Sequence, residues 1–515
     1  MHRLDSLRLL QRVDAVRLEA SRTLDEGRRI LLGQYMTPAP VARLIASMFD
    51  LPSEELRILD PGSGVGSLTA ALVEEACGRA RRPRSITADA FELDQSLVPH
   101  LRATLRACDR DAKECGVRFT GRVVTHDFIG AATSALGQGL FQQRAPETYN
   151  AAILNPPYRK IHSASRERKL LRAAGIETTN LYTAFVALAL RLLEPGGELV
   201  AITPRSFCNG PYFRPFRRLL LGEASLSRVH VFEARDRAFA SDSVLQENVI
   251  FHVRKDPTRG TVVLSTSAAP DAPVSTRMVP HDAVVDPADP EAFIHLAVSE
   301  EDAGVAYRMR ALPARLDELG LEVSTGRVVD FRAREHLRAD PGPRTVPLVY
   351  PSHLDAGVVS WPRLGGRKPN ALADEPQTRD LMVPSETYVL TKRFTSKEER
   401  RRVVAAVYDP ARLRLAERVG FENHLNYFHA RGRGMPKVVA WGLATYLNST
   451  LVDAYFRQFN GHTQVNAADL RSLRYPSLTQ LKTMGRRAPR SSSEQARVDV
   501  VVQAVLDQTG KLSAR

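Results

Sequence analysis

The stretch Leu56-Arg57-Ile58-Leu59-Asp60-Pro61-Gly62-Ser63-Gly64-Val65-Gly66 decides the fold of the N-terminal half of the chain. Residues 56–60 form a short apolar run and predict a buried strand. The glycines that follow let the backbone approach a bound group and start the next helix tightly. Residues 68–80 then have helical character. The stretch therefore predicts a strand, a glycine loop and a helix in direct succession.

Outward from this stretch, strands and helices alternate as far as about residue 256. Strands are predicted over 85–94, 122–128, 149–158, 198–204, 228–234 and 248–255, and helices over 98–113 and 180–197. Upstream, 1–30 carries apolar residues at helical spacing, and 41–49 predicts a helix that Thr37 caps, with Pro38 at its first position. The alternation predicts an α/β fold, a doubly wound parallel sheet with crossover helices on both faces.

After residue 256 the pattern changes. Segment 261–290 is rich in Pro, Ala and Asp and predicts loops and short strands. Helices are predicted over 291–316 and 496–508, with short strands, prolines and basic clusters over 321–480. We therefore expect two domains, an α/β domain over 1–256, with N-terminal helices in 1–50, and a mixed α+β domain over 257–515.

The composition is that of an ordinary globular protein. The 515 residues are 43% hydrophobic and 25% charged, which argues against global disorder. The formal net charge of +14 favours a polyanionic partner, most often nucleic acid. The four cysteines form no C-x-x-C pair, so we expect no structural metal. No apolar run is long enough to span a membrane and no signal peptide is evident, so we expect a cytoplasmic protein with no membrane partner.

One acid lies at the end of each of two further strands. Glu92 is well placed to accept hydrogen bonds from a ribose diol, and Asp127 could accept from an adenine exocyclic amine. With Asp60 these acids outline an adenosine-bearing ligand, because parallel strands end at one edge of the sheet. The spacing G-x-G-x-G lacks the last glycine of the dinucleotide fingerprint, and an ordinary βα turn with solvated acids is the alternative interpretation.

The fourth strand ends in Asn155-Pro156-Pro157-Tyr158. The two prolines stop the strand and fix the backbone, which holds the carbonyls of Asn155 and Pro156 rigidly. The Asn155 side-chain oxygen and a neighbouring carbonyl are two acceptors that suit a planar amine with two hydrogens. Tyr158 offers a flat face for stacking on a base. The alternative is a proline-kinked loop with a core tyrosine.

These elements resemble the γ order of DNA adenine-N6 methyltransferases. The resemblance rests on 60–66, on 155–158, and on Gly33-Gln34-Tyr35-Met36-Thr37-Pro38, which precedes the glycine loop as that order requires. Segment 232–251, with Phe239-Ala240-Ser241-Asp242-Ser243 and Gln246-Glu247-Asn248, resembles the family's late motif. Segment 461–470 resembles the tail of target-recognition regions in type II modification enzymes, closest to the BsuBI/PstI-like methylases. The resemblance covers 30–256 well and 320–476 loosely.

The resemblance implies a Rossmann-like domain dependent on S-adenosylmethionine, followed by a DNA target-recognition domain. It implies that Thr37 and Pro38, with Tyr35 in the same motif, border the methionine part of the cofactor. Asp60, Gly62 and Gly64 would line that pocket. Glu92 would hold the ribose, and Asp127 and Phe128 would frame the adenine. It also implies that Asn155 and Pro156, beside Pro157, bind the target amine, and that Tyr158 and Phe239 sandwich the target base. Ser63 departs from the Cys, Ala or Thr more usual in the family.

The expected reaction is methyl transfer to the N6 amine of an adenine flipped out of duplex DNA. The C-terminal domain would grip phosphates and read bases, and His462 and Gln464 are candidates because they lie in a loop that begins with a glycine. We see no nuclease motif, so a cognate restriction endonuclease would be a separate protein. Alternatives are methylation of RNA or of protein glutamine, and a non-catalytic specificity subunit.

Overall fold

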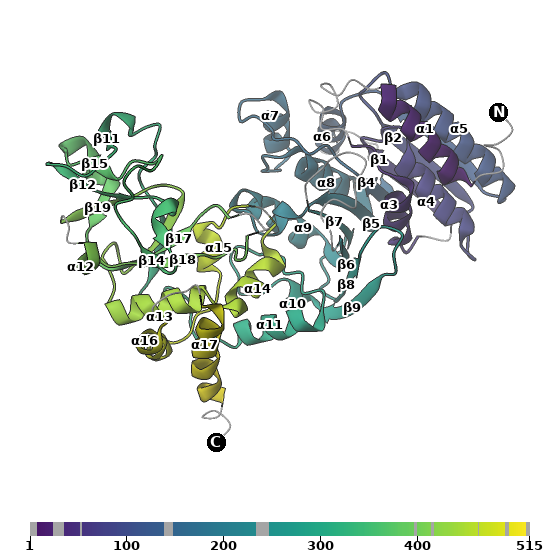
Figure 1. The fold of residues 1–515 in the computed structure, drawn as a ribbon. Helices are drawn as coiled ribbons and strands as arrows, with labels where there is room; N and C mark the ends of the chain where they lie inside the picture. Colours follow the sequence, from purple (N-terminus) through teal and green to yellow (C-terminus); the bar gives the residue numbers. More distant parts are fainter. Residues whose placement is uncertain are drawn as a thin grey trace. The chain divides into compact units, whose positions relative to one another are not determined.

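The computed structural model describes residues 8–23, 35–51, 54–138, 148–232, 247–395, 399–413, 417–461, 463–489 and 494–510. The chain divides into two compact units, Met1–Val298 and Ser299–Arg515 (Figure 1). The first unit extends beyond the boundary expected at residue 256. The reason is that β8 (Thr261–Ser267) and β9 (Ser275–Pro280) pair into its sheet, although their segment is rich in loop-forming residues.

The described part of the N-terminal unit is built on a nine-stranded sheet of order β3-β2-β1-β4-β5-β7-β6-β8-β9. The remaining strands are β1 (Glu55–Pro61), β2 (Ser85–Phe91), β3 (Arg118–Val124), β4 (Tyr149–Leu154), β5 (Leu193–Pro204), β6 (Ser225–Phe232) and β7 (Asn248–Arg254). The first five strands in this order, β3 to β5, run parallel. They confirm the predicted doubly wound α/β arrangement.

Strand β7 departs from the expected direction. It pairs antiparallel with both β5 and β6. The sheet is therefore mixed at this end, and β6 and β8 pair parallel beyond it. The apolar pattern of 248–255 predicts a buried strand but contains no information on its direction.

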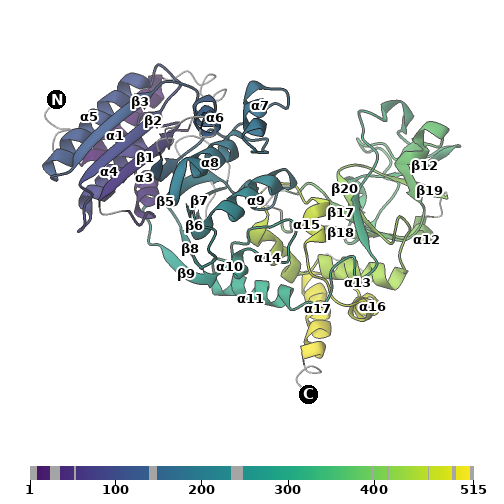
Figure 2. The same cartoon turned by 180° about the vertical axis from the view of Figure 1, so that it is seen from behind.

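Helices cover both faces of the sheet (Figures 1 and 2). One apolar core contains side chains of α1 (Leu9–Thr23), α3 (Ala39–Ser47), α4 (Ser67–Gly78) and α5 (Val98–Glu114). The other contains side chains of α6 (Phe128–Gln138), α7 (Arg166–Ala173), α8 (Leu181–Leu192) and α9 (Arg214–Glu223). Alternate residues of β4 face opposite cores: Ala151 and Ile153 lie in the first and Ala152 and Leu154 in the second.

Several predicted bounds differ from the observed ones. The strand expected over 122–128 is β3, which begins and ends about four residues earlier, because Asp127 and Phe128 belong to the start of α6. The helix expected over 180–197 ends at Leu192, and the sequence Pro195-Gly196-Gly197 falls inside β5. The smaller elements of this unit are η1 (Arg205–Cys208), η2 (Pro211–Phe213) and α10 (His281–Val284).

The C-terminal unit is mixed α+β, as expected. Its described residues form one sheet of order β10-β20-β17-β18-β14-β13 and another of order β11-β15-β12-β19-β16. The strands are β10 (Glu322–Thr325), β11 (Leu337–Arg338), β12 (Thr345–Val349), β13 (Leu354–Asp355), β14 (Val358–Val359), β15 (Ala371–Ala373), β16 (Met382–Pro384), β17 (Tyr388–Lys392), β18 (Ala405–Tyr408), β19 (Arg418–Phe421) and β20 (Leu425–His429).

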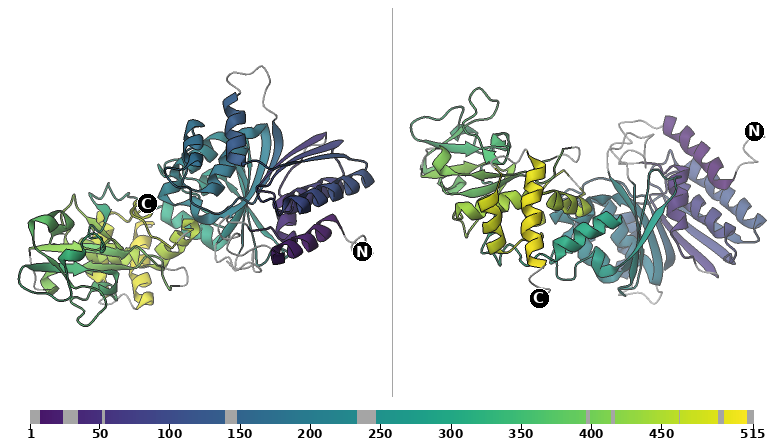
Figure 3. Two further views of the ribbon diagram at one scale, coloured as in Figure 1. Left: turned by 90° about the horizontal axis from the view of Figure 1, so that it is seen from above. Right: turned by 60° about the horizontal axis from the view of Figure 1, so that its bottom comes forward.

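Helices accompany these strands in the same unit (Figure 3). They are α11 (Glu300–Arg310), α12 (Pro410–Leu413), α13 (Lys437–Leu447), α14 (Thr450–Phe459), α15 (Ala467–Arg471), α16 (Leu478–Arg487) and α17 (Gln495–Gly510), with the 3₁₀ turns η4 (Arg334–His336), η5 (Pro351–His353) and η6 (Pro376–Leu381). The helix predicted over 291–316 is confined to α11, whereas the predicted terminal helix is present as α17.

Helices α13 and α16 approach each other through glycines. A Cβ added to Gly442 would lie 1.8 Å from the Leu481 carbonyl oxygen, and one added to Gly485 would lie 1.8 Å from that of Val438. The two backbones are therefore in direct contact, and only glycine fits at either position. Among the helices that the structure describes, none is long and apolar enough to cross a bilayer.

Candidate active site

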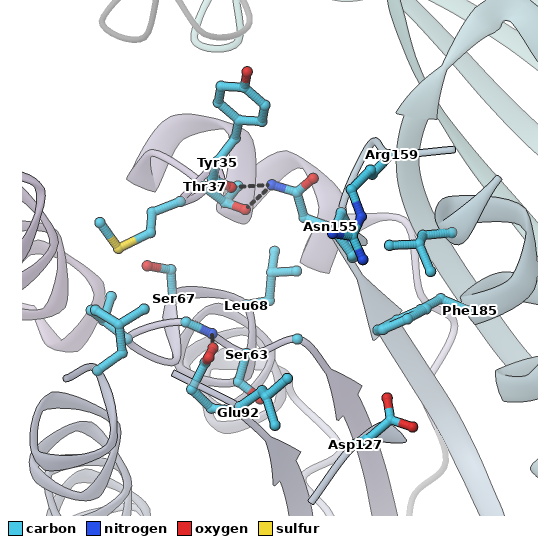
Figure 4. Close-up of a pocket in the computed structure, with 18 of the residues that line it drawn as sticks. Tyr35, Thr37, Ser63, Ser67, Leu68, Glu92, Asp127, Asn155, Arg159 and Phe185 are labelled. Atoms are coloured by element: carbon cyan, nitrogen blue, oxygen red, sulfur yellow. Dashed lines mark hydrogen bonds between the residues drawn. The ribbon is translucent and has the colours of Figure 1, made fainter. Parts of the chain in front are cut away.

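A cavity opens where the carboxyl ends of β1, β2 and β4 meet (Figure 4). Its lining comprises Tyr35, Met36, Thr37, Gly62, Ser63, Gly64, Val65, Ser67, Leu68, Glu92, Leu93, Leu97, Asp127, Ile129, Asn155, Pro157, Arg159, Glu167, Leu181 and Phe185. In Figure 4, Asn155 and Thr37 lie across the cavity from Glu92 and Asp127. The fold thus brings the glycine loop, both strand-end acids and the asparagine to one place.

The glycine loop takes a conformation that other residues rarely adopt. Gly62, Gly64 and Gly66 have φ angles of +81°, +56° and +87°. A Cβ at Gly66 would also lie 2.9 Å from a side-chain carbon of Leu101 on α5. The loop is anchored to β2, because the amides of Gly62 and Ser63 donate to the Phe91 carbonyl at 2.9 and 2.8 Å. Glycine is required here both by backbone conformation and by close packing.

Glu92 connects β2 to the glycine loop. Its carboxylate accepts from the amide of Gly64 at 2.8 Å and from that of Asp94 at 2.6 Å. Burial raises the pKa of Glu92 to about 7, although these hydrogen bonds oppose the shift. A carboxylate has about four lone-pair sites. Two accepted bonds therefore leave capacity for a ligand hydroxyl in the cavity.

Asp60 is not part of the cavity wall. It is fully buried, and its Oδ2 accepts from the Thr69 hydroxyl at 2.6 Å. Its Oδ1 has no hydrogen-bond partner, and burial raises the pKa of Asp60 to about 7. The Ser63 hydroxyl donates to the Asp60 carbonyl at 2.7 Å. Asp60 therefore bonds to the loop through its backbone carbonyl and to the first turn of α4 through its side chain.

Asp127 reaches the cavity, whereas Phe128 does not line it. The Asp127 carboxylate accepts from the Gly130 amide at 2.8 Å at the start of α6. Phe128 is buried and packs on Phe185, with ring centroids 5.0 Å apart. Phe185 in turn lines the cavity together with Ile129. Phe128 thus contacts the cavity wall from behind.

The side chain of Asn155 is held in one orientation by the segment that precedes β1. Its Nδ2 donates to the Tyr35 carbonyl at 2.7 Å and to the Thr37 hydroxyl at 3.0 Å (Figure 4). Both amide hydrogens are thereby used, which leaves Oδ1 as the acceptor of this side chain. Thr37, expected to cap the following helix, makes no such cap: Pro38 is the N-cap residue of α3.

Tyr158 lies beside this amide. Its hydroxyl donates to Asn155 Oδ1 at 3.0 Å and to the Ile202 carbonyl at 3.3 Å. Its ring centroid is 6.1 Å from that of Tyr35, at an interplanar angle of 33°. Burial raises the pKa of Tyr158, so the phenol stays protonated and acts as a donor at neutral pH.

Some of the predicted site residues line the cavity, and others do not. Pro38, Asp60, Phe128, Pro156 and Tyr158 are not part of its lining, and Phe239 lies outside the described residues. No sequence pattern distinguishes Phe185 or Leu181 from the other residues of their largely apolar helix. Arg159 was predictable as the cation next to Tyr158. Nowhere in the described ranges do three or more His, Cys, Asp or Glu residues form a group able to hold a metal ion.

Comparison with known proteins gives a consistent result. The family model "Eco57I restriction-modification methylase" matches residues 124–239. The type II methyltransferase M.PstI of Providencia stuartii is 46% identical over 95% of this chain and 96% of its own length. The type II methyltransferase M.BsuBI of Bacillus subtilis is 43% identical over 93% of this chain and 94% of its own.

A solved structure supports the fold. The type IIL restriction-modification enzyme MmeI, determined in complex with DNA, matches with a TM-score of 0.53 at 11% identity, covering 96% of this chain and 73% of that one. At this identity the likeness concerns the fold alone. The close sequence relatives carry the assignment: the chain belongs to the family of type II methyltransferases of restriction-modification systems that includes M.PstI and M.BsuBI.

Proposed function

We propose that this protein transfers a methyl group from S-adenosylmethionine to the exocyclic N6 amine of an adenine in duplex DNA. The observation that carries the proposal is the orientation of Asn155. Its amide hydrogens are bound by Tyr35 and Thr37, so Oδ1 is the acceptor available to an amine. This acceptor belongs to a residue in the wall of the cavity that also contains Glu92 and the glycine loop.

The residues of the cavity fit an adenosine-bearing cofactor with an amino-acid tail. Glu92 suits a ribose diol, and Leu93, Ile129 and Phe185 offer apolar surface for a base. The Ser67 hydroxyl is buried in the wall at the start of α4 and has no hydrogen-bond partner, so it suits a polar group of the tail. A helix N-terminus also favours a carboxylate. When bound, S-adenosylmethionine supplies an electrophilic sulfonium methyl group.

The chain itself prepares the nucleophile. The lone pair of the adenine amine is delocalised into the ring, which makes the amine a poor nucleophile. Asn155 Oδ1 and the Pro156 carbonyl would accept its two hydrogens, and the fixed backbone of Pro156 and Pro157 would hold these acceptors in place. Accepting both hydrogens localises the lone pair, and positioning supplies much of the remaining rate. The product amine loses its proton easily, so the reaction requires no strong base.

The target base must leave the duplex to reach this site. Flipping costs a few kcal/mol, and stacking on an aromatic ring offsets part of that cost. Tyr158 is the described residue suited to this role, because its hydroxyl hydrogen bonds hold its ring beside Asn155. Phe239, in the segment outside the described residues, is the proposed second ring.

Duplex DNA is the substrate that charge and domain organisation favour. The formal net charge is +14, and Lys and Arg neutralise phosphates in sequence-independent binding. The C-terminal unit would supply target recognition, and any cognate endonuclease would be a separate protein. In a bacterial or archaeal cell such an enzyme works in the cytoplasm, where the chromosome lies.

Transfer of a labelled methyl group tests the proposal. We expect tritium from S-adenosyl-[methyl-³H]methionine to enter duplex DNA as N6-methyladenine, and not RNA or a release-factor protein. Asn155→Ala should abolish transfer while leaving cofactor affinity, measured by calorimetry, unchanged. An active Asn155→Ala protein, or label found only in RNA or protein, would refute the proposal. Failure to bind the cofactor would instead favour a non-catalytic DNA-binding subunit.

A further inference from the structure

Phe394 and His424 form an exposed aromatic pair in the C-terminal unit. Phe394 follows β17 and has 41% of its surface exposed, unusual for a phenylalanine. Its ring centroid lies 4.8 Å from that of His424, which precedes β20 and is also exposed. The guanidinium of Arg393 lies 5.7 Å from the Phe394 centroid. An exposed aromatic pair next to a cation is suited to contact with nucleic acid.

The loop that begins at Gly461 lies directly beside this pair. Thr395 N donates to the Thr463 carbonyl at 3.1 Å, and Val465 N donates to the Arg393 carbonyl at 2.7 Å. Phe394 and Gln464 thereby form an antiparallel bridge. On the opposite side, Arg393 N donates to the His424 carbonyl at 2.8 Å. We call Phe394, His424, Thr463 and Gln464 the Phe394 cluster.

Buried polar side chains hold the backbone of this cluster. Arg402, which is 1% exposed, donates to the Thr395 carbonyl and, at 2.7 Å, to Asn460 Oδ1. Asn460 Nδ2 in turn donates to the Gln464 carbonyl at 3.0 Å. Asn426, fully buried, donates to the Val465 carbonyl at 2.8 Å. Burying charged and polar groups is costly unless they are paired, so these bonds indicate a loop held in one conformation.

The imidazole of His424 is also fixed. Its Nδ1 and its backbone amide both bond to the carboxylate of Glu422, which is buried. With Nδ1 engaged, Nε2 is the ring nitrogen left to face a partner. The structure thus presents three kinds of group on one small surface: an apolar ring, an oriented imidazole, and the polar Thr463-Gln464 segment.

From this arrangement we infer that the Phe394 cluster contacts base edges of the target duplex and contributes to sequence recognition. The inference rests on the proposed function and extends it to named residues. Phenylalanine contacts the thymine methyl group or wedges between base steps, and an imidazole nitrogen can form a hydrogen bond with a base edge. One exposed ring flanked by a cation is too little apolar surface for a stable protein interface. His462, in the same loop, lies outside the described residues.

Two substitutions in the full-length protein test the inference. We expect Phe394→Ala and His424→Ala each to lower kcat/KM on duplex DNA containing the target site by about 5- to 100-fold, the usual effect of losing a base contact. Affinity for the cofactor should stay within about twofold of the wild-type value. The melting temperature should stay within a few degrees of that of the wild type. Tyr307→Ala is the matched control, because Tyr307 is an exposed aromatic residue on α11 of the same unit, remote in sequence from the cluster.

Sequence preference provides a second readout that a loss of stability would not alter. Methylome sequencing of hosts that express each variant should show a relaxed motif at one or two positions. Photo-cross-linking of wild-type protein to target duplexes carrying 5-iodouracil in place of single thymines should label the peptides that contain Phe394 or His424.

Unchanged kcat/KM and an unchanged motif in both variants, with cross-links elsewhere, would overturn this inference while leaving DNA methylation intact. If the wild-type protein methylates RNA or protein and not DNA, both the proposed function and this inference fall. The two failures are therefore distinguishable within one set of experiments.

Discussion

The Tyr158 hydroxyl donates a hydrogen bond to Asn155 Oδ1 across 3.0 Å. The oxygen proposed to accept from the substrate amine is therefore already fixed before any substrate arrives. An amide oxygen has two lone pairs, so it can accept from Tyr158 and from the amine at the same time. Tyr158 therefore has two proposed roles: its hydroxyl helps to fix the Asn155 oxygen, and its ring stacks on the target base.

Substitution of Tyr158 should separate the ring from the hydroxyl. Tyr158→Phe keeps the ring and removes the hydroxyl that bonds to Asn155 Oδ1 and the Ile202 carbonyl, so we expect kcat to fall by only about fivefold, with little change in KM for DNA. Tyr158→Ala also removes the stacking surface, worth about 1–3 kcal/mol per base, and should weaken productive DNA binding about 5- to 150-fold. Steady-state kinetics of both variants on one duplex would measure this difference. Equal losses of kcat/KM in the two variants would contradict the stacking role.

Thr37 should act by orienting Asn155. Thr37→Val keeps the side-chain shape but removes the acceptor that binds Asn155 Nδ2, so we expect kcat to fall about tenfold. Thr37→Ser retains a hydroxyl and should restore most of the rate. Calorimetric affinity for S-adenosylmethionine should stay within about threefold in both. A loss confined to cofactor affinity would show that Thr37 serves only the cofactor pocket.

Cofactor binding should depend on the ionisation of Glu92. Burial raises the pKa of Glu92 to about 7, and the proposed ribose contact uses the carboxylate as an acceptor. Protonation therefore competes with binding, and we expect affinity to fall as the pH drops below about 7. Glu92→Gln, an uncharged isostere, should bind more weakly at pH 8 and show a flat profile between pH 6 and 8. Titration calorimetry across that range is the measurement, and a flat wild-type profile would exclude this linkage.

Asp60 should make stability fall as the pH rises. Its pKa in the folded protein is about 7, compared with an ordinary value of 3.8 that we take for the unfolded chain. Between these values the folded state binds more protons than the unfolded state, so the free energy of unfolding decreases with increasing pH. Asp60→Asn removes this contribution. Urea unfolding at pH 5 and pH 8 should show a smaller difference for the variant than for the wild type; an identical difference would argue against a raised pKa.

The contact between α13 and α16 should tolerate no side chain. Gly442→Ala would place a methyl group against the Leu481 carbonyl, and we expect a destabilisation of about 2 kcal/mol or more. Gly304→Ala is the control, because a Cβ at Gly304 on α11 meets nothing within 4 Å. That change should be neutral or stabilise by up to about 1 kcal/mol. Thermal unfolding of the Gly442→Ala and Gly304→Ala variants is the measurement. Equal melting temperatures would show that α13 and α16 can move apart at little cost in free energy.

Much of the N-terminal unit could be predicted because its signals are local. The glycine loop, the strand-end acids and Asn155 each follow a strand, and the carboxyl ends of parallel strands lie at one edge of a sheet. The structure gathers Gly62, Glu92, Asp127 and Asn155 in one cavity wall. The reversed direction of β7 could not be predicted, since a buried strand has the same apolar pattern in either direction. Short strands were predicted within 261–290, but a composition typical of loops did not indicate that β8 and β9 belong to the N-terminal sheet.

Contacts between distant segments account for the other omissions. The bond between Thr37 and Asn155 joins residues 118 positions apart, and no pattern in either segment indicates it. Phe394 and His424 likewise come together only because β17 ends beside the start of its antiparallel neighbour β20. Phe185 is one apolar residue among many in α8, so its place in the cavity wall depends on the rotation of that helix.

The hydrogen bonds from Asn155 to the Tyr35 carbonyl and the Thr37 hydroxyl make residues 35–37 part of the proposed amine-binding site. Without these two acceptors the asparagine amide could rotate and present nitrogen where the proposed reaction requires oxygen. Val41 and Ile45 bury α3 in an apolar core beside the sheet, so the packing of this helix helps to hold the two acceptors that precede it.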